Sequence, residues 1–378
     1  MSDVSETSTG LTDLGPEMRV KVLLQVVLLA LVLYVFLVSI GLLGSSFKLF
    51  GKDLAQQLIE MTSNPVVGLV AGVLATTLAQ SSSTTTSIAV GMVAGGALTI
   101  EGAIPVIMGA NIGTSVTNTL VSMGHITRRE EFRRALAGAT VHDFFNIISV
   151  LVLLPLEVAF GYLQAVALWA ATVFQGVGGL EFSSPIKALT KPAVAWLLDL
   201  FGQNPTLGVI VALALMYGSL KFLVDLAKGL VVQRSGRLIN RYLFGAPLVA
   251  MAFGVLMTVL VQSSSISTSM VVPLVGAGIL TLEAVFPYTL GANVGTTITA
   301  MLAALATGNI AAVTVAFSHL AFNVAGIVMV YPLPPIRRIP LALARLLATL
   351  AMRSRAYAVV YVITVFYALP LALILIWR

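Results

Sequence analysis

The stretch LATTLAQSSSTTTSIAVGMV, residues 74–93, decides the fold of this chain. Its flanks are apolar, but its middle is an unbroken run of amide and hydroxyl side chains from Gln80 to Ser87. About 15 apolar residues precede Gln80 and about 12 follow Ser87, and each arm is shorter than the roughly 20 residues that a helix needs to cross a bilayer. The stretch therefore predicts a re-entrant helical hairpin with a polar tip.

The composition places this hairpin in a membrane protein. The chain is 58% hydrophobic and 10% charged, with a mean hydropathy of +1.01, whereas soluble domains carry about 25% charged residues. The first apolar run, Val22 to Leu43, is longer than the ~7–15 residues of a signal-peptide core, and no clear cleavage site follows it. We expect it to be retained as a membrane span behind a polar, disordered leader.

Cysteine content and net charge exclude other classes. With no cysteine, the chain has neither a disulfide framework nor a thiolate metal site. Its net charge of +6 indicates basic cytoplasmic loops rather than nucleic-acid binding. We expect no cofactor apart from a coupling ion.

The polar stretch occurs twice. AQSSSTTTS at 79–87 returns as VQSSSISTS at 261–269, and GANIGTSVT at 109–117 returns as GANVGTTIT at 291–299, both at the same spacing of 182 residues. A third pair, ATVHDFFN at 139–146 and AFSHLAFN at 316–323, places His142 and His319 four residues before an asparagine, on one helical face. NPVVG at 64–68 also resembles NPTLG at 204–208. Each half thus contains a hairpin, a Gly-Ala-Asn span and a His-x-x-x-Asn span.

The loops predict that the halves have opposite orientations. The first half continues into GHITRREEFRR, which carries Arg128, Arg129, Arg133 and Arg134, whereas the equivalent LATGNIAA is uncharged. The positive-inside rule places the first loop in the cytoplasm, with the basic segments Lys228–Arg241 and Arg337–Arg355. The fold class is therefore an all-α membrane protein of inverted-topology repeats, each with a re-entrant hairpin.

The polar tips suit a substrate site. Hydroxyls and backbone N–H groups at a helix N-terminus bind an oxyanion, and side-chain oxygens can coordinate Na⁺ without a fixed charge at membrane depth. Serine and threonine can also act as packing contacts between membrane helices, but two clusters in register favour one shared site. For His142 and His319 we favour structural bridging between the repeats, and Glu101 and Glu283 are expected at the interface.

Asp143 is the one intramembrane carboxylate without a counterpart, since the equivalent position is Leu320. A carboxylate in this position indicates cation or proton coupling; a structural hydrogen bond is the alternative.

The chain resembles the type II sodium–phosphate cotransporter family. The resemblance rests on the twin Gln-Ser-Ser-Ser and Gly-Ala-Asn motifs, EFRRALAGATVHDFFN at 131–146 and Tyr331-Pro332-Leu333-Pro334, and it covers the chain from about residue 20. It implies phosphate transport driven by the sodium gradient, a substrate site at the hairpins, and sodium binding at Asp143 and Asn146.

Together these arguments give two candidate sets. The predicted substrate residues are Gln80, Ser81, Ser82, Ser83, Gln262, Ser263, Ser264 and Ser265. The predicted sodium ligands are Thr84, Asn111, Thr114, Asp143, Asn146, Asn293, Thr296 and Asn323.

Three positions depart from the family pattern. His125 and Arg128 replace residues expected as Gln and Asp, and Ala292 replaces a serine, which alters one sodium site of the family. The chain ends at Arg378 and lacks the large central loop of animal members, so we expect a multi-pass protein of a bacterial inner membrane.

Other functions remain as alternatives. A symporter of another oxyanion or small solute is the nearest one, because residue chemistry alone gives a secondary transporter with an uncharged polar site. An intramembrane serine protease needs one activated serine and one base, which a duplicated site does not favour, and no ring of carboxylates indicates a channel.

The predicted organisation has six parts. They are a leader at 1–20, a first helix and interfacial segment at 21–63, repeat 1 at 64–156, an interfacial or extra span at 157–205, repeat 2 at 206–335, and a basic loop with a last span at 336–378.

Overall fold

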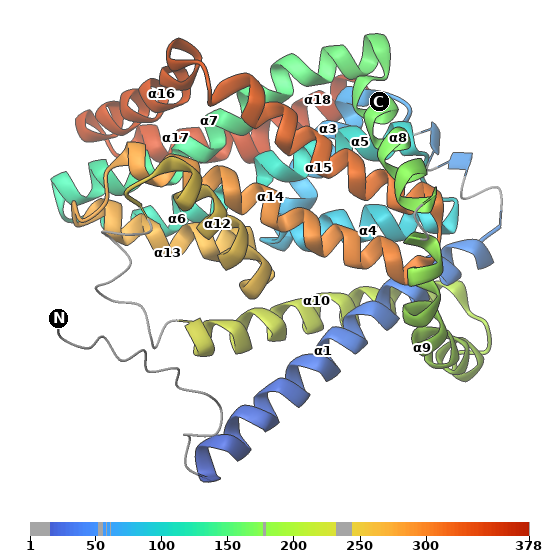
Figure 1. Cartoon of the computed structure of the whole chain (residues 1–378). Coiled ribbons are helices and arrows are strands. Elements are labelled where there is room, and N and C mark those ends of the chain that lie inside the picture. Colours follow the sequence, from blue (N-terminus) through green and yellow to red (C-terminus); the bar gives the residue numbers. More distant parts are fainter. Residues whose placement is uncertain are drawn as a thin grey trace.

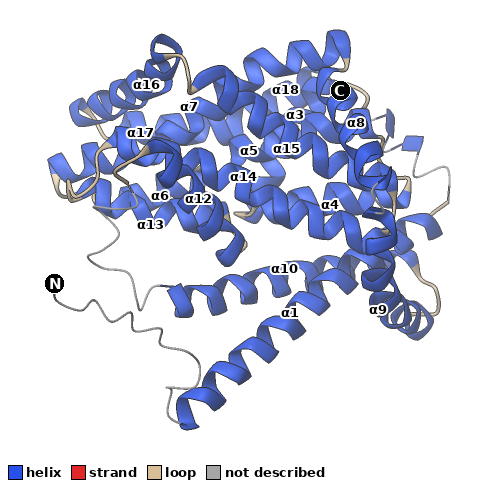
Figure 2. Ribbon diagram, viewed as in Figure 1, coloured by secondary structure: helices blue, strands red, loops and turns tan. Residues whose placement is uncertain are grey.

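All regular structure in the described residues is helical. The computed structural model describes residues 16–51, 56–57, 59–60, 62–176, 179–231 and 244–377, and these ranges contain no strand (Figure 2). The helices are α1 (Pro16–Leu49), α3 (Pro65–Ala79), α4 (Ser82–Gly95), α5 (Ile100–Gly113), α6 (Val116–Met123), α7 (Arg129–Phe160), α8 (Tyr162–Gly176), α9 (Gly179–Leu200), α10 (Pro205–Val231), α12 (Pro247–Val261), α13 (Ser264–Gly276), α14 (Leu282–Thr307), α15 (Ile310–Val330), α16 (Pro334–Arg353), α17 (Ala356–Ile363), the π-helical turn η3 (Thr364–Ala368) and α18 (Leu369–Trp377).

The helices include several that are long and apolar enough to cross a membrane. Within the described ranges there are six: Val27–Leu49, Arg129–Phe160, Pro205–Phe222, Leu282–Thr307, Ile310–Val330 and Ala356–Trp377. The chain is thus a multi-pass, all-α membrane protein. The hairpin helices α3, α4, α12 and α13 have 13 to 15 residues, too short to cross about 30 Å of hydrocarbon at 1.5 Å per residue.

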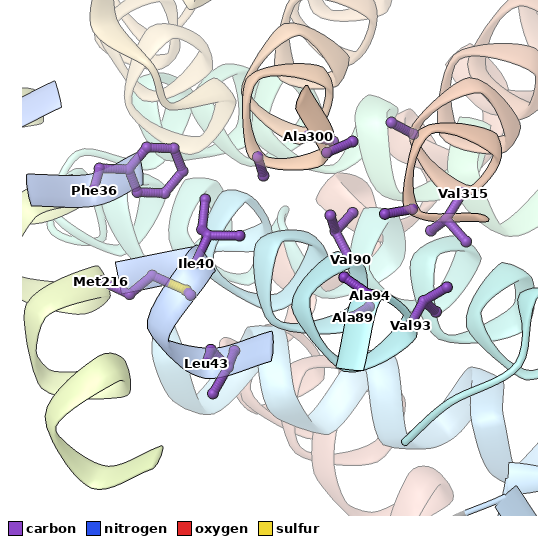
Figure 3. Close-up of a cluster of buried hydrophobic side chains, with 14 of the residues drawn as sticks. Phe36, Ile40, Leu43, Ala89, Val90, Val93, Ala94, Met216, Ala300 and Val315 are labelled. Carbon is purple, nitrogen blue, oxygen red and sulfur yellow. The ribbon is translucent and has the colours of Figure 1, made fainter. Parts of the chain in front are cut away.

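The largest apolar cluster joins helices from both halves of the sequence. Figure 3 shows Phe36 and Ile40 of α1, Val90 of α4, Met216 of α10 and Ala300 of α14 gathered in one region. All five are buried. The first hairpin is therefore held against helices that lie more than 100 residues away in the sequence.

Each hairpin packs tightly on its own Gly-Ala-Asn helix through glycine. A Cβ on Gly109 of α5 would overlap the carbonyl oxygen of Leu69 in α3, and a Cβ on Gly291 of α14 would overlap that of Met251 in α12. Small residues allow such close backbone approach in membrane helices. The first arm of each hairpin is thus fixed by its following helix.

Reciprocal contacts relate the two halves. Arg134 Nε, at the start of α7, donates to the carbonyl of Gly276 at the end of α13 (2.8 Å), while Asn309 Nδ2, before α15, donates to the carbonyl of Ala94 at the end of α4 (3.4 Å). Each half therefore makes the same kind of contact with the other, as in a two-fold arrangement. In Figure 1, α4 and α13 extend toward opposite sides of the molecule.

Several predicted boundaries differ from the structure. The helix α1 begins at Pro16, within the predicted leader, whose residues 1–15 lie outside the described residues. Residues 157–160 complete α7, and α8 has 15 residues, fewer than a span needs. The segment NPTLG, which resembles NPVVG at the start of α3, begins the helix α10 at Pro205 but is not part of the repeat. The counterpart of α3 in the second half is α12 and not α10. Of the segment Lys228–Arg241, residues 232–241 lie outside the described residues.

Candidate functional site

The two hairpin tips have the same backbone geometry. Gln80 and Gln262 adopt left-handed conformations, with φ of 55° and 57°, which end α3 and α12. This region is uncommon for residues other than glycine. The repeated Gln therefore marks the place where each helix breaks.

Both glutamine side chains hold the break in place. Gln80 Nε2 donates to the carbonyl of Thr77 (2.8 Å), and its Oε1 accepts from the hydroxyl of Thr117 (2.9 Å). Gln262 repeats both bonds, to Val259 (2.6 Å) and from Thr299 (2.9 Å). Each amide thus joins the end of one helix to a later helix of the same repeat.

A serine then starts the returning helix. Ser81 accepts from the backbone N–H of Thr84 (3.2 Å), and Ser263 accepts from that of Ile266 (3.4 Å). Serine is a favoured N-cap because its oxygen satisfies an N–H group that has no partner within the helix. The positive ends of α4 and α13 therefore both lie at the tips, where they attract anions.

The tips meet around one pocket. Ser83 Oγ donates to the carbonyl of Gln262 (3.3 Å), and Ser265 Oγ donates to that of Thr114 (3.2 Å). Beside them lies a cavity of about 300 Å³. Its lining residues are Ala79, Gln80, Ser81, Thr84, Thr117, Tyr217, Leu220, Lys221, Gln262, Ser263, Ser265 and Ile266.

The structure divides the predicted substrate residues into two groups. Gln80, Ser81, Gln262, Ser263 and Ser265 line the pocket. The other three, which are Ser82, Ser83 and Ser264, are at most 3% exposed and lie outside its lining. Of the predicted sodium ligands, only Thr84 lines this pocket.

Four other predicted sodium ligands form a buried cluster with the two histidines. Asn146 Nδ2 donates to the carbonyl of Asn111 (2.8 Å), and Asn323 Nδ2 donates to that of Asn293 (3.1 Å). His142 Nε2 lies 2.6 Å from Asn293 Oδ1, and His319 Nε2 lies 3.3 Å from Asn111 Oδ1. Each histidine bridges to the asparagine of the other repeat, as predicted.

The cluster is not symmetric in detail. Asn293 Nδ2 donates to Asn146 Oδ1 (2.8 Å), but the equivalent atoms, Asn111 Nδ2 and Asn323 Oδ1, are buried without a hydrogen-bond partner in the described part of the chain. Buried polar groups are nearly always paired. The unpaired amide oxygen of Asn323 is available to coordinate a cation, and sodium is bound by oxygen ligands of this kind.

Asp143 lies next to the C-terminal helix. Its Oδ2 accepts from the hydroxyl of Tyr361 in α17 (2.9 Å), and its Oδ1 has no partner among the described residues. The carboxylate is fully buried. A hydrogen bond from one hydroxyl leaves a carboxylate oxygen free for a second partner.

The remaining predicted sodium ligands make local bonds. The hydroxyls of Thr114 and Thr296 donate to the carbonyls of Ala110 (2.9 Å) and Ala292 (3.1 Å) within their own helices. Thr84 Oγ1 donates to Ser81 Oγ (2.9 Å). Their oxygens can still accept, but the structure does not gather them into one group.

The family departures His125 and Arg128 form a local ion-pair group. His125 Nδ1 lies 3.3 Å from Glu131, and Arg128 lies 3.2 Å from the same carboxylate. These residues stabilise the start of α7.

Three functional candidates were missed by the sequence analysis. Tyr217 and Lys221 reach the pocket from α10, and Tyr361 reaches Asp143 from α17. A charge within an apolar span is a signal of function, so Lys221 in LMYGSLKFLV, residues 215–224, could have been identified.

The matches of this sequence to known proteins all indicate the same family. The sequence model described as Na⁺/Pi-cotransporter matches residues 35–181 and 214–352, one segment over each repeat. The chain is 37% identical to sodium-dependent phosphate transport protein 2A of Ovis aries over 92% of its own length and 67% of that protein. It is 36% identical to sodium-dependent phosphate transport protein 2B of Homo sapiens over 92% of its length and 64% of that protein. No solved structure matches the chain significantly.

Proposed function

The chain belongs to the Na⁺/Pi-cotransporter family, and on that premise we propose that it couples sodium influx to uptake of inorganic phosphate. Its named relatives are sodium-dependent phosphate transport proteins. The observation that carries the proposal is the pocket between the tips, which both repeats line with amide and hydroxyl groups.

The pocket suits an oxyanion for two physical reasons. Two helix N-termini and a lysine supply positive potential, and serine, threonine and glutamine side chains supply hydrogen-bond donors. The described residues that line the pocket include no carboxylate, which would repel an anion. We assign substrate binding to Gln80, Ser81, Gln262, Ser263 and Ser265.

Sodium binding is assigned to buried oxygens that do not line the pocket. Asn323 Oδ1 and Asp143 Oδ1 are candidates because each lacks a hydrogen-bond partner, and oxygen ligands suit a hard cation. We assign no cofactor besides the coupling ion and place the protein in the inner membrane.

We propose that transport proceeds by alternating access, in which the pocket between the two hairpin tips opens first to one side of the membrane and then to the other. This requires the halves to be inverted in the membrane. Single cysteines at Thr127 and Thr307, on the cysteine-free background, test the inversion with a membrane-impermeant maleimide. Labelling of both positions from the same side would refute it.

Transport itself is tested with purified protein in proteoliposomes. Uptake of radiolabelled phosphate is measured with Na⁺ or K⁺ outside and the voltage clamped by an ionophore. Phosphate uptake only with Na⁺ is the expected result. Sodium-dependent uptake of sulfate in place of phosphate would identify another oxyanion as the substrate, and uptake independent of Na⁺ would exclude sodium coupling.

A further inference from the structure

A second basic cavity lies away from the transport pocket, between the start of α7 and the junction of α16 and α17. Its volume is about 350 Å³, and it is lined by Arg129, Phe132, Ala351, Met352, Arg353 and Arg355. It shares no lining residue with the pocket between the hairpin tips. Three arginines, Arg129, Arg353 and Arg355, therefore line one cavity outside the transport pocket.

These three arginines have no carboxylate partner in the described part of the chain. Their neighbours Arg128 and Arg133 pair with Glu131 and Glu130. In contrast, Arg355 lies over the ring of Phe132, 5.7 Å from its centroid, a contact that orients the guanidinium without neutralising it. The cavity thus retains its positive charge.

The cavity lies where two candidate membrane spans begin. Two candidate spans begin beside it, Arg129–Phe160 and Ala356–Trp377. Directly beyond it, α17 presents the exposed apolar side chains Tyr357, Val360 and Ile363. A polar cavity is therefore followed by an apolar face along the same helix.

We propose that this cavity binds the phosphate headgroup of an anionic phospholipid. Guanidinium groups recognise phosphate oxygens through paired hydrogen bonds, and the uncapped first turn of α7 adds backbone N–H donors. The apolar face of α17 accommodates the acyl chains, which a free phosphate ion lacks. The basic segments around the cavity belong to the side predicted as cytoplasmic, where basic pockets between membrane helices bind anionic lipids.

The test is native mass spectrometry of the full-length protein, titrated with phosphatidylglycerol or with phosphatidylcholine of the same chains. Phosphatidylglycerol should bind saturably and more tightly than phosphatidylcholine. Arg353→Gln should weaken phosphatidylglycerol binding about fivefold, because a basic residue near an anionic headgroup contributes about that factor. Arg338→Gln, which removes the same charge from α16 outside the cavity, should leave binding unchanged.

Three results would overturn the proposal. Equal weakening by Arg353→Gln and Arg338→Gln would indicate a general effect of surface charge. Unchanged binding in a folded Arg353→Gln protein would remove the cavity from lipid recognition, and Arg355→Gln provides a second variant if the first folds poorly. Displacement of the lipid by millimolar inorganic phosphate, with the same dependence on Arg353, would identify a free-phosphate site instead.

Discussion

Lys221→Gln should weaken phosphate affinity while leaving sodium dependence intact. Lys221 is the only charged residue among the described residues that line the pocket between the hairpin tips. Glutamine keeps a polar side chain of similar reach but removes the charge. The substitution therefore isolates the electrostatic contribution of one side chain to anion binding.

The size of the pocket sets the expected magnitude. A sphere of about 300 Å³ has a radius of about 4 Å, so an ammonium group at its wall lies within about 6 Å of an anion at its centre. At an effective dielectric constant of about 40, unit charges at that distance attract by about 1.4 kcal/mol, which is about tenfold in affinity. Divalent phosphate doubles this energy, to about 2.8 kcal/mol or a hundredfold.

The assay is sodium-driven phosphate uptake in proteoliposomes, with KM measured for the wild type and Lys221→Gln. Lys48→Gln, which removes an exposed lysine outside this pocket, is the matched control. Lys221→Arg should restore most of the affinity. Raising ionic strength with choline chloride at constant Na⁺ should increase KM for the wild type more than for Lys221→Gln, because salt screens the lost attraction.

An unchanged KM in a correctly inserted Lys221→Gln protein would refute this reasoning. An equal rise in KM for Lys48→Gln would refute it as well, since the effect would then arise from the net charge of the protein and not from the pocket.

Three further substitutions test the hairpins, the helix packing and the coupling. Ser81→Ala should raise the KM for phosphate more than Ser82→Ala, because only Ser81 lines the pocket; equal KM values in an uptake assay would place the anion elsewhere. Gly109→Ala should destabilise the protein by about 1–3 kcal/mol, because the added Cβ would overlap a backbone carbonyl of α3. Gly218→Ala is the control, because a Cβ at Gly218 would meet no neighbouring atom. Thermal melting in detergent compares the two, and equal melting temperatures would contradict the packing argument. Asp143→Asn should raise the Na⁺ concentration for half-maximal uptake at fixed voltage without changing phosphate selectivity; an unchanged sodium dependence would leave this carboxylate with a purely structural hydrogen bond.

The sequence predicted the hairpins well because their causes are local. A Gln-Ser pair supplies both a helix end and an N-cap, and the flanking arms are too short to span, so the break at Gln80 and Gln262 follows from residues within a few positions. The histidine bridges were predicted as well, because a repeated His-x-x-x-Asn motif is compatible with pairing between repeats.

Pairings that depend on distant helices were not predictable in the same way. Lys221 reaches the pocket from α10, and Tyr361 reaches Asp143 across 218 residues of sequence. No short-range pattern encodes either contact. The identical Gly-Ala-Asn motifs also gave no sign that Asn293 would be fully paired while Asn111 is not, because this difference arises from the packing of helices and not from the motif.

The contacts that join the two halves also govern how the protein is made. Ser83 pairs with a carbonyl 179 residues later, and His319 pairs with Asn111 across 208 residues. At about 5–20 residues per second of synthesis, the first hairpin is inserted roughly 10 to 40 seconds before its partner exists. During that interval its polar tip lacks the contacts that the second half supplies. Biogenesis of this protein therefore passes through a half-built stage in which the first hairpin is present but its contacts with the second half have not yet formed.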